Sequence, residues 1–385
     1  MAALTFLSVP QLHMERGAQH RLGQILRQRL GHHRVMLVTD AQLHRSGLLA
    51  PALDSLAQAG LETLVFDEVV ADPPEAVVLE ASARARHAEV GLVLGMGGGS
   101  SMDVAKLVAL LTRSPQPLAQ MYGIDQAQGE RLPLVQVPTT AGTGSEVTPI
   151  AILTLGQDAK KGVVDRRLMA DLAVLDASLT TGLPAAVTAA TGIDAMVHAI
   201  EAFTSARLKN PLSDLLACQA LQLLSTHLAT ACRHGDNLDA REAMLLGALL
   251  AGQAFANAPV GAVHALAYPL GARFHIPHGL SNALMLGPVL RFNAQVAPGA
   301  YAPLASVLAP ESASGPDDQR CAAVLQALTR CVADTGLALR LRDHGVPQDE
   351  LPRLAADAML QTRLLINNPR PLDESQALAL YRQAW

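Results

Sequence analysis

The first half of the chain alternates short apolar runs with longer stretches of helical character. Four apolar runs are typical of strands buried in a parallel sheet; they cover residues 34–40, 61–66, 90–97 and 134–138. Helix-length stretches, such as 19–30 and 74–88, lie between these runs. Because strands that alternate with helices form parallel sheets with both faces covered, the pattern predicts an α/β domain.

The second half of the chain has a different pattern. After Pro184 almost every segment is rich in alanine and leucine at helical spacing. The predicted helices cover residues 213–231, 239–256, 316–335 and 347–361. We place the change near residues 180–184, which predicts an α/β domain over 1–182 and an all-helical domain over 183–385. A chain of 385 residues is also longer than one hydrophobic core usually supports.

The composition is that of a globular protein, with 50% hydrophobic and 16% charged residues. A net charge of -5 leaves no basic excess for binding nucleic acid. Residues 244–272 contain no charged side chain, but Gln253, Asn257 and Pro259 interrupt them, so two buried helices joined by a turn are expected, not a membrane span. Residues 1–10 lack the features of a signal peptide and the four cysteines form no C-x-x-C pair, so a reducing cytoplasm is expected.

A glycine-rich segment at residues 95–103 follows a predicted strand and opens a predicted helix. Glycine lets the backbone come close to a ligand, and the N-terminus of a helix offers free N–H groups to a pyrophosphate. Gly95 and Gly97 match the G-x-G-x-x-G pattern, whose third position is Ser100 here. A structural turn is the alternative interpretation, but the strand before the segment and the helix after it favour a dinucleotide cofactor.

Two further features support a dinucleotide site. The segment 138–146 places Thr139 and Thr140 beside two glycines after a strand, which suits hydrogen bonds to an amide or a phosphate, although an ordinary turn has a similar composition. Asp40 ends the first apolar run. A carboxylate there can bind an adenosine ribose and repel a 2′-phosphate, or it can cap the next helix.

Asp194 and His198 are four residues apart in a predicted helix over 191–201, so they lie on one face, separated by about 6 Å of helical rise. By itself this could be a hydrogen-bonded pair on a helix surface. Downstream, His264, His275 and His278 fall in a core-like stretch. One carboxylate with three imidazoles suits Fe(II) or Zn(II) with a position left open for a substrate oxygen, and the order of metal affinities does not decide between them.

The runs 97–106, 138–149, 192–201 and 264–282 resemble the signatures of the iron-containing (group III) alcohol dehydrogenases. This family includes lactaldehyde reductase and bacterial butanol and ethanol dehydrogenases. The resemblance extends from about residue 40 to residue 282, in order and with normal spacing. It implies a dinucleotide-binding α/β domain, an all-helical domain, and an active site with a divalent metal in the cleft between them. The implied reaction is NAD(P)-linked oxidation of an alcohol or reduction of an aldehyde.

The resemblance also implies roles for individual residues. The four metal ligands are Asp194, His198, His264 and His278. The pyrophosphate loop consists of Gly97, Gly98, Gly99, Ser100 and Ser101. Further cofactor contacts are Thr139, Thr140, Thr148 and Lys161. Asp40 matches the acidic position that favours NAD over NADP. Fe(II) is favoured over Zn(II), and a homodimer is expected.

Two positions depart from the family pattern. Many members have a second histidine four residues after the third ligand, near the substrate and proposed to help proton transfer, whereas this chain has Tyr268. Many members have asparagine or another residue where this chain has His275. Tyr268 and His275 are therefore the candidate catalytic residues for proton transfer. The alternative is that neither relays the proton, which then leaves through ribose hydroxyls and water.

Three other functions are compatible with parts of this pattern. A dehydroquinate-synthase-like lyase also uses NAD and a metal, but it would need a dense cluster of lysine and arginine near the metal. None of the basic residues between positions 194 and 282 adjoins a ligand; they are Arg207, Lys209, Arg233, Arg241 and Arg273. A zinc glycerol dehydrogenase fits the run 277–279 less well. A dinucleotide sensor or a metal-binding protein, in either case without enzymatic activity, is a further alternative. The expected partner is a small alcohol or aldehyde, with neither nucleic acid nor membrane.

Overall fold

The computed structural model of the chain describes residues 4–31, 34–156 and 159–385, which fold as two compact units. One unit is Leu7–Gly182, and the other is Leu183–Trp385 together with residues 4–6. The division therefore falls within the segment 180–184, where the sequence pattern changes. The active-site cleft expected between two domains stays a prediction.

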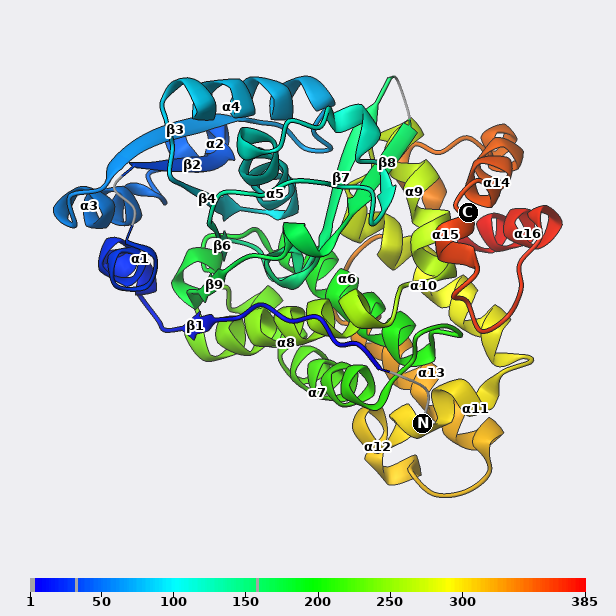
Figure 1. Ribbon diagram of the computed structural model, residues 1–385. Coiled ribbons are helices and arrows are strands. Elements are labelled where there is room, and N and C mark those ends of the chain that lie inside the picture. Colours follow the sequence, from blue (N-terminus) through cyan, green and yellow to red (C-terminus); the bar gives the residue numbers. More distant parts are fainter. Residues whose placement is uncertain (1–3, 32–33, 157–158) are drawn as a thin grey trace. The chain divides into compact units, whose positions relative to one another are not determined.

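The unit Leu7–Gly182 is built on a six-stranded sheet in the order β1-β9-β6-β4-β2-β3 (Figure 1). Its strands are β1 (Leu12–Met14), β2 (Arg34–Asp40), β3 (Glu62–Val69), β4 (Leu92–Gly97), β6 (Leu134–Pro138) and β9 (Leu172–Leu175). Every neighbouring pair in this sheet is parallel. The predicted α/β fold with a parallel sheet is confirmed.

Helices cover both faces of this sheet. They are α1 (Leu22–Leu30), α2 (Ala41–Arg45), α3 (Ala50–Gln58), α4 (Glu75–His87) and α5 (Gly99–Arg113). Side chains such as Leu37 and Leu94 share one buried core with α1 and α3. On the other face α5 lies against Gly95, where an added Cβ would come within 2.8 Å of the Ala105 side chain. Burial on both faces explains why the strands are continuous apolar runs.

The strand order contains a switch point at the carboxyl ends of β2 and β4. The chain continues from β2 to β3 on one side of β2, and β4 lies on the other side. Connections that leave in opposite directions create a crevice at this point, where open parallel sheets bind their ligands. Asp40 ends β2 and Gly97 ends β4, so both predicted cofactor positions lie at the switch point.

A second sheet of three strands, in the order β5-β8-β7, follows the glycine-rich region. Its strands are β5 (Gly123–Ile124), β7 (Ile150–Leu155) and β8 (Ala159–Val164), and β7 pairs antiparallel with β8. Single 3-10 turns complete this unit at η1 (Ala18–Arg21), η2 (Leu118–Gln120), η3 (Ser145–Val147), η4 (Arg166–Leu168) and η5 (Ala177–Thr180). The sequence pattern does not predict the second sheet.

Within residues 183–385 the described chain forms helices and no strand. The longer helices are α6 (Ala185–Thr204), α7 (Pro211–Arg233), α8 (Leu238–Asn257), α9 (Ala262–Phe274), α10 (His278–Ala294), α13 (Asp317–Ala333), α14 (Leu351–Met359) and α16 (Glu374–Ala384). The shorter ones are α11 (Pro298–Tyr301), α12 (Ala305–Leu308) and α15 (Thr362–Leu365), with 3-10 turns at η6 (Ala302–Leu304), η7 (Pro310–Ser312), η8 (Leu341–His344) and η9 (Gln348–Glu350). The predicted all-helical architecture is confirmed. Helix α6 is central, since it packs against α7, α8 and α10.

The apolar segment 244–272 belongs to two helices. Helices α8 and α9 meet at an angle of 106°, and most of their side chains are buried. Two buried helices joined by a turn are therefore confirmed. By length and composition α7 could also span a membrane, but it packs against α6 and α8.

Candidate metal centre and dinucleotide site

Helix α6 carries the first two predicted metal ligands. It begins after Pro184 and continues through an alanine-rich sequence to Thr204, a composition that favours helix. Asp194 and His198 are one turn apart and are buried, with 1% and 4% of their surface exposed. A carboxylate this deeply buried needs a compensating cation or hydrogen bonds.

Helices α9 and α10 bring two more histidines to α6. His264 lies in the first turn of α9, and His278 is the first residue of α10. The N-terminal end of α10 contacts α6 at Gly279, where a Cβ atom would lie only 2.6 Å from the carbonyl oxygen of Ala190. Glycine is required for this close approach, which sets His278 beside Asp194.

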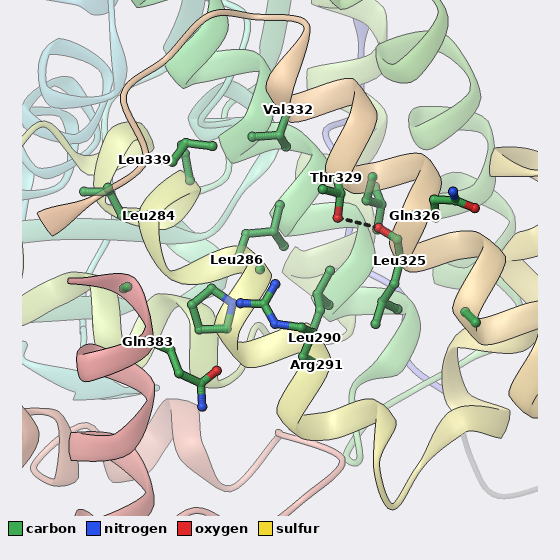
Figure 2. Close-up of a pocket in the computed structure, with 16 residues that line it drawn as sticks. Leu284, Leu286, Leu290, Arg291, Leu325, Gln326, Thr329, Val332, Leu339 and Gln383 are labelled. Atoms are coloured by element: carbon green, nitrogen blue, oxygen red, sulfur yellow. Dashed lines mark hydrogen bonds between the residues drawn. The ribbon is translucent and has the colours of Figure 1, made fainter.

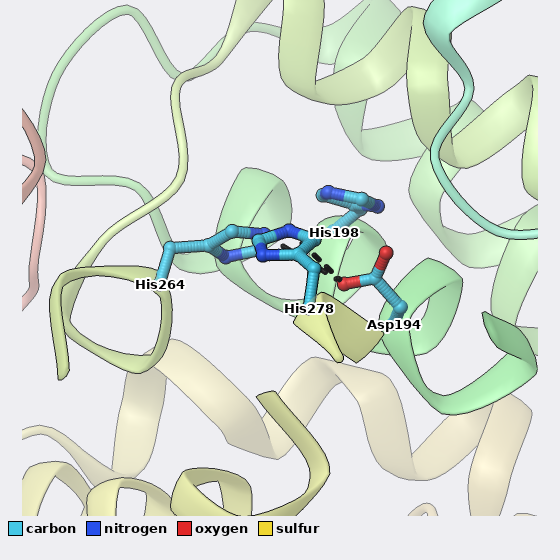
Figure 3. Close-up of side chains that lie close together, drawn as sticks. All are labelled: Asp194, His198, His264 and His278. Atoms are coloured by element: carbon cyan, nitrogen blue, oxygen red, sulfur yellow. Dashed lines mark ion pairs between the residues drawn. The ribbon is translucent and has the colours of Figure 1, made fainter. Parts of the chain in front are cut away.

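The four predicted ligands form one cluster (Figure 3). One ligand atom from each side chain lies within 4.8 Å of those of the others. Oδ1 of Asp194 is 3.9 Å from Nε2 of His264 and 3.7 Å from Nε2 of His278. A carboxylate with three imidazoles at this spacing is a donor set that suits a divalent iron or zinc ion.

Glu201, for which the sequence pattern predicts no role, orients His264. Its Oε2 accepts a 2.7 Å hydrogen bond from Nδ1 of His264, and its Oε1 accepts another from the backbone N–H of Val263. Nδ1 then carries the proton and Nε2 is free to bind a metal, which is a common arrangement around metal-binding histidines. Glu201 follows His198 by three residues, so helical spacing could have placed it on the ligand face.

Burial and proximity shift the pKa values of this cluster. Burial alone would raise the pKa of Asp194, but the neighbouring histidines outweigh it, so the pKa is lowered and the carboxylate stays ionised. Burial lowers the pKa of His264 well below its usual value, which keeps the imidazole neutral, as metal binding requires. Burial raises the pKa of Glu201 to about 7.

Asn282 also faces the cluster, one turn after His278 in α10. It is fully buried, and its Nδ2 donates a 2.6 Å hydrogen bond to Oδ1 of Asp194. The same amide nitrogen is 3.2 Å from Nε2 of His264 and 3.3 Å from Nε2 of His278. Asn282 therefore fixes the carboxylate among the imidazoles, and its spacing of four residues from His278 is the signal for it in the sequence.

The two candidate proton-transfer residues lie in different settings. The ring of Tyr268 is half-buried, and its centroid is 5.9 Å from that of His278. His275 is exposed and ends α9 with a left-handed backbone conformation, at a φ of 54°. His275 is not among the four clustered ligands.

The glycine-rich segment forms a tight turn between β4 and α5. At Gly97 a Cβ atom would lie 2.7 Å from Oγ of Ser101, and Ser101 itself is buried. Gly98, Gly99 and Ser100 are half-buried, and no side chain caps the N-terminus of α5. The first turn of α5 therefore keeps the N–H groups that suit an anion.

The second predicted loop lies directly beside the first. The backbone N–H of Thr139 donates to the carbonyl oxygen of Gly97 at 2.9 Å, and a Cβ at Gly99 would lie 2.9 Å from the Thr143 side chain. Thr139 is buried and Thr140 is half-buried. The two loops thus form a continuous surface at the ends of adjacent strands.

The remaining predicted cofactor residues have partners within the protein. Oδ1 of Asp40 accepts the backbone N–H of Leu43 at 2.9 Å, so Asp40 caps α2. The hydroxyl of Thr148 is 3.2 Å from Nζ of Lys106, which donates to it. Lys161 is exposed on β8, and its Nζ lies 5.9 Å from the ring centroid of Tyr122.

An apolar pocket of about 430 Å³ lies in the helical unit (Figure 2). Leucines of α10 and α13, including Leu284, Leu286 and Leu325, form much of its wall, and Arg291 lies within it. None of the predicted metal or catalytic residues lines this pocket.

Two family models cover nearly the whole chain. The model of iron-containing alcohol dehydrogenases matches residues 10–177, and the model of the C-terminal region of the Fe-containing alcohol dehydrogenase family matches residues 188–385. The long-chain-alcohol dehydrogenase 1 of Geobacillus thermodenitrificans is 39% identical over 388 residues, which cover 100% of this chain and 98% of that protein.

Solved structures agree with these matches. A crystal structure of a 1,3-propanediol oxidoreductase has a TM-score of 0.95 and 35% identity, with 100% of each chain covered. The sulfoacetaldehyde reductase of Bifidobacterium kashiwanohense, in complex with NAD+, has a TM-score of 0.87 and 26% identity, with 100% of this chain and 99% of that chain covered. This chain therefore belongs to the iron-containing alcohol dehydrogenase family, whose members are oxidoreductases that use NAD and a divalent metal.

Proposed function

We propose that Asp194, His198, His264 and His278 hold the divalent metal of this alcohol dehydrogenase. The observation that carries the proposal is their clustering, with one ligand atom of each within 4.8 Å of the others. A metal bound there supplies Lewis acidity to a substrate oxygen, and the dinucleotide supplies or accepts the hydride. Fe(II) is the proposed metal, and Zn(II) suits the same donors.

The exposure of the ligands indicates the direction from which a substrate arrives. The side chain of His278 is 33% exposed, whereas those of Asp194 and His264 are 2% and 3% exposed. His198 is covered by Phe255, whose ring centroid is 4.3 Å from its own. A substrate therefore approaches beside His278 and Tyr268, and the opposite side of the cluster excludes water.

The glycine-rich turn and the loop beside it are the proposed dinucleotide site. Gly97, Gly98, Gly99, Ser100 and Ser101 would hold the pyrophosphate at the N-terminus of α5. Thr139, Thr140 and Lys161 are proposed as further contacts, while the hydroxyl of Thr148 would act through Lys106. Asp40 would bind the adenosine ribose through Oδ2, because only Oδ1 is used for the helix cap. NAD is accordingly the proposed cofactor, in preference to NADP.

For proton transfer, Tyr268 is proposed in preference to His275. The ring of Tyr268 is near that of His278, and His275 is exposed at the end of α9. Tyr268 would pass the proton of the alcohol through its hydroxyl.

The assignment of one binding function to each unit is also a proposal. Residues 1–182 would bind the dinucleotide and residues 183–385 the metal. A homodimer in the cytoplasm is proposed for the whole protein, and the four free cysteines fit a reducing compartment. The lyase alternative is not favoured, since the related proteins are alcohol dehydrogenases and aldehyde reductases.

A panel assay tests the proposal. Protein stripped of metal and reloaded with Fe(II) or Zn(II) would be given alcohols and aldehydes of increasing chain length, with NAD or NADP. We expect metal-dependent turnover with NAD, and its loss in His264→Ala but not in the exposed control His234→Ala. Equal turnover in stripped and reloaded protein would contradict the assignment of the cluster.

A further inference from the structure

Lys106 is a fully buried lysine on α5, about two helical turns after Gly99. Its Nζ lies close to four oxygen atoms. The nearest are the carbonyl oxygen of Ile150 at 2.6 Å and Oγ of Ser145 at 2.7 Å. Oγ1 of Thr148 follows at 3.2 Å and Oδ1 of Asp103 at 3.3 Å. An ammonium group has three protons and no acceptor, so this shell of oxygens suits a charged lysine.

Asp103 completes the network around this charge. Its Oδ1 accepts a 2.6 Å hydrogen bond from Oγ of Ser145, and its Oδ2 accepts the backbone N–H of Ile152 at 2.9 Å. Burial lowers the pKa of Lys106, while the charges of Asp103 and Glu146 oppose that shift. With these hydrogen bonds, the side chains of Lys106, Asp103 and Ser145 all have partners. A buried polar network that is fully hydrogen-bonded makes a structure rigid.

The network connects the two segments that surround the candidate dinucleotide site. Asp103 and Lys106 are on α5, directly behind the pyrophosphate turn. Their partners are in residues 145–152, which follow the loop that contains Thr139 and Thr140. The segments also touch at their tips, where Gly99 lies against Thr143. The separation of the two loops is thus set by two contacts. One is the hydrogen bonding of Lys106 and Asp103 to residues 145–152, and the other is the packing of Gly99 against Thr143.

We propose that Lys106 is a positioning residue for the dinucleotide, which it serves by holding the two loops at a fixed separation together with Asp103. The proposal rests on the dinucleotide site proposed above. A site whose loops are already in place binds its ligand without the cost of ordering them. Loss of Lys106 should therefore weaken dinucleotide binding through the position of the loops, although Lys106 itself is fully buried.

Titration of metal-loaded protein with NADH, followed by fluorescence, tests this role. We expect Lys106→Met to raise the Kd for NADH by about tenfold or more, as loss of a hydrogen-bonded charge would. The KM for NAD should rise in parallel, while kcat at saturating NAD and the metal content stay near wild type. Because Lys106→Met leaves Asp103 without its cationic partner, two milder variants accompany it. They are Ser145→Ala and the double variant Lys106→Met, Asp103→Asn.

Arg131→Met is the matched control. Arg131 forms a two-pronged ion pair with Asp171, at 2.6 and 2.9 Å, before the amino end of β6 and away from the loops at the carboxyl ends. The Arg131→Met substitution should lower thermal stability without changing the Kd for NADH. An unchanged Kd in folded Lys106 and Ser145 variants, or an equal rise in Arg131→Met, overturns the positioning role. If wild-type protein does not bind NADH, the proposed function itself fails.

Discussion

Glu201 decides which nitrogen of His264 is available to a metal. Because Nδ1 donates a hydrogen bond to Oε2 of Glu201, the lone pair of the ring is on Nε2, which faces Asp194. A carboxylate in this position also makes the imidazole more basic and fixes the plane of its ring. The other oxygen of Glu201 accepts the N–H of Val263, so one side chain both anchors the start of α9 and orients the candidate ligand His264.

We therefore expect Glu201→Gln to lower metal affinity by about 10–100-fold. The amide has no negative charge to hold the imidazole proton, so the orientation of His264 is less well defined. Competition with a chromogenic chelator for Zn(II) measures the affinity, with the exposed Glu311→Gln as control. An unchanged affinity in folded Glu201→Gln would mean that Glu201 only anchors α9.

Asp40 combines two roles that a single substitution can separate. Its Oδ1 caps α2, and its charge is expected to repel the 2′-phosphate of NADP. Serine also caps helices but carries no charge. Asp40→Ser should therefore keep the protein stable while it narrows the preference for NAD, chiefly through a lower KM for NADP. A wild type that already prefers NADP, or a variant with the same preference as wild type, would rule out the ribose role.

Tyr268 and His275 can be compared directly as proton relays. A positioned acid or base typically contributes about 10²–10⁴-fold to turnover. We expect Tyr268→Phe to reduce kcat at pH 7 by at least roughly 100-fold, and less at high pH, where hydroxide in bulk water replaces the relay. His275→Ala, at equal metal content, should cost much less because His275 is exposed. Near-normal turnover in both variants would leave ribose hydroxyls and water as the proton route.

At the scale of elements, the site depends on how closely α10 approaches α6. The contact is made at Gly279, where a Cβ would overlap the carbonyl oxygen of Ala190 and touch Cβ of Asp194 at 3.3 Å. Backbone atoms in the middle of a helix cannot move away easily. Any side chain at position 279 must therefore shift the end of α10 that carries His278.

Gly279→Ala should accordingly destabilise the protein by about 1–3 kcal/mol, as overpacking in a core does. It should also weaken metal binding, because a displaced His278 no longer meets the geometry that a metal requires. Gly182→Ala is the matched control, since nothing lies within 4 Å of a Cβ there. Thermal unfolding and chelator competition measure the two effects. Wild-type metal affinity in Gly279→Ala would show that α10 has room to adjust.

The elements that the sequence predicts are those with a strong local signal. The predicted strands at 34–40 and 134–138 have the same bounds as β2 and β6, because buried parallel strands are continuous apolar runs. In contrast, β1 has three residues and belongs to the sheet only through pairing with β9, about 160 residues away. Such strands depend on tertiary contacts, so the pattern of neighbouring residues in the sequence does not predict them.

The candidate site divides in the same way. Residue types and helical spacing indicated a metal site at Asp194 and His198, and the resemblance to the family singled out His264 and His278. The structure brings these four candidate ligands together. The roles of Glu201 and Asn282 depend on which helix faces which, although their spacing from His198 and His278 was a usable signal. Lys106 gave no signal, since a lysine in an amphipathic helix usually faces solvent. Only the packing of α5 against residues 145–152 shows that it is buried.

At the scale of the whole molecule, the two kinds of binding group are in different units. All four candidate metal ligands belong to the unit Leu183–Trp385, and both candidate dinucleotide loops belong to Leu7–Gly182. Each unit has its own core and its own polar network, the first around Glu201 and the second around Lys106. Binding of one group should therefore survive the loss of the other, even though turnover needs both.

Asp194→Ala and His264→Ala test this separation. Each should abolish stable metal binding, because the three remaining donors hold a metal poorly. The buried group that was hydrogen-bonded to the removed side chain also loses that partner. The Kd for NADH should stay within about threefold of wild type, since the candidate metal ligands and the dinucleotide loops belong to separate units with separate polar networks. Metal added at 100 times its Kd should stabilise wild type by about 2.7 kcal/mol and neither variant. Elemental analysis, NADH fluorescence titration and thermal unfolding measure the three quantities. Full metal occupancy in the variants would refute the ligand assignment, and loss of NADH binding in the folded variants would refute the independence of the two units.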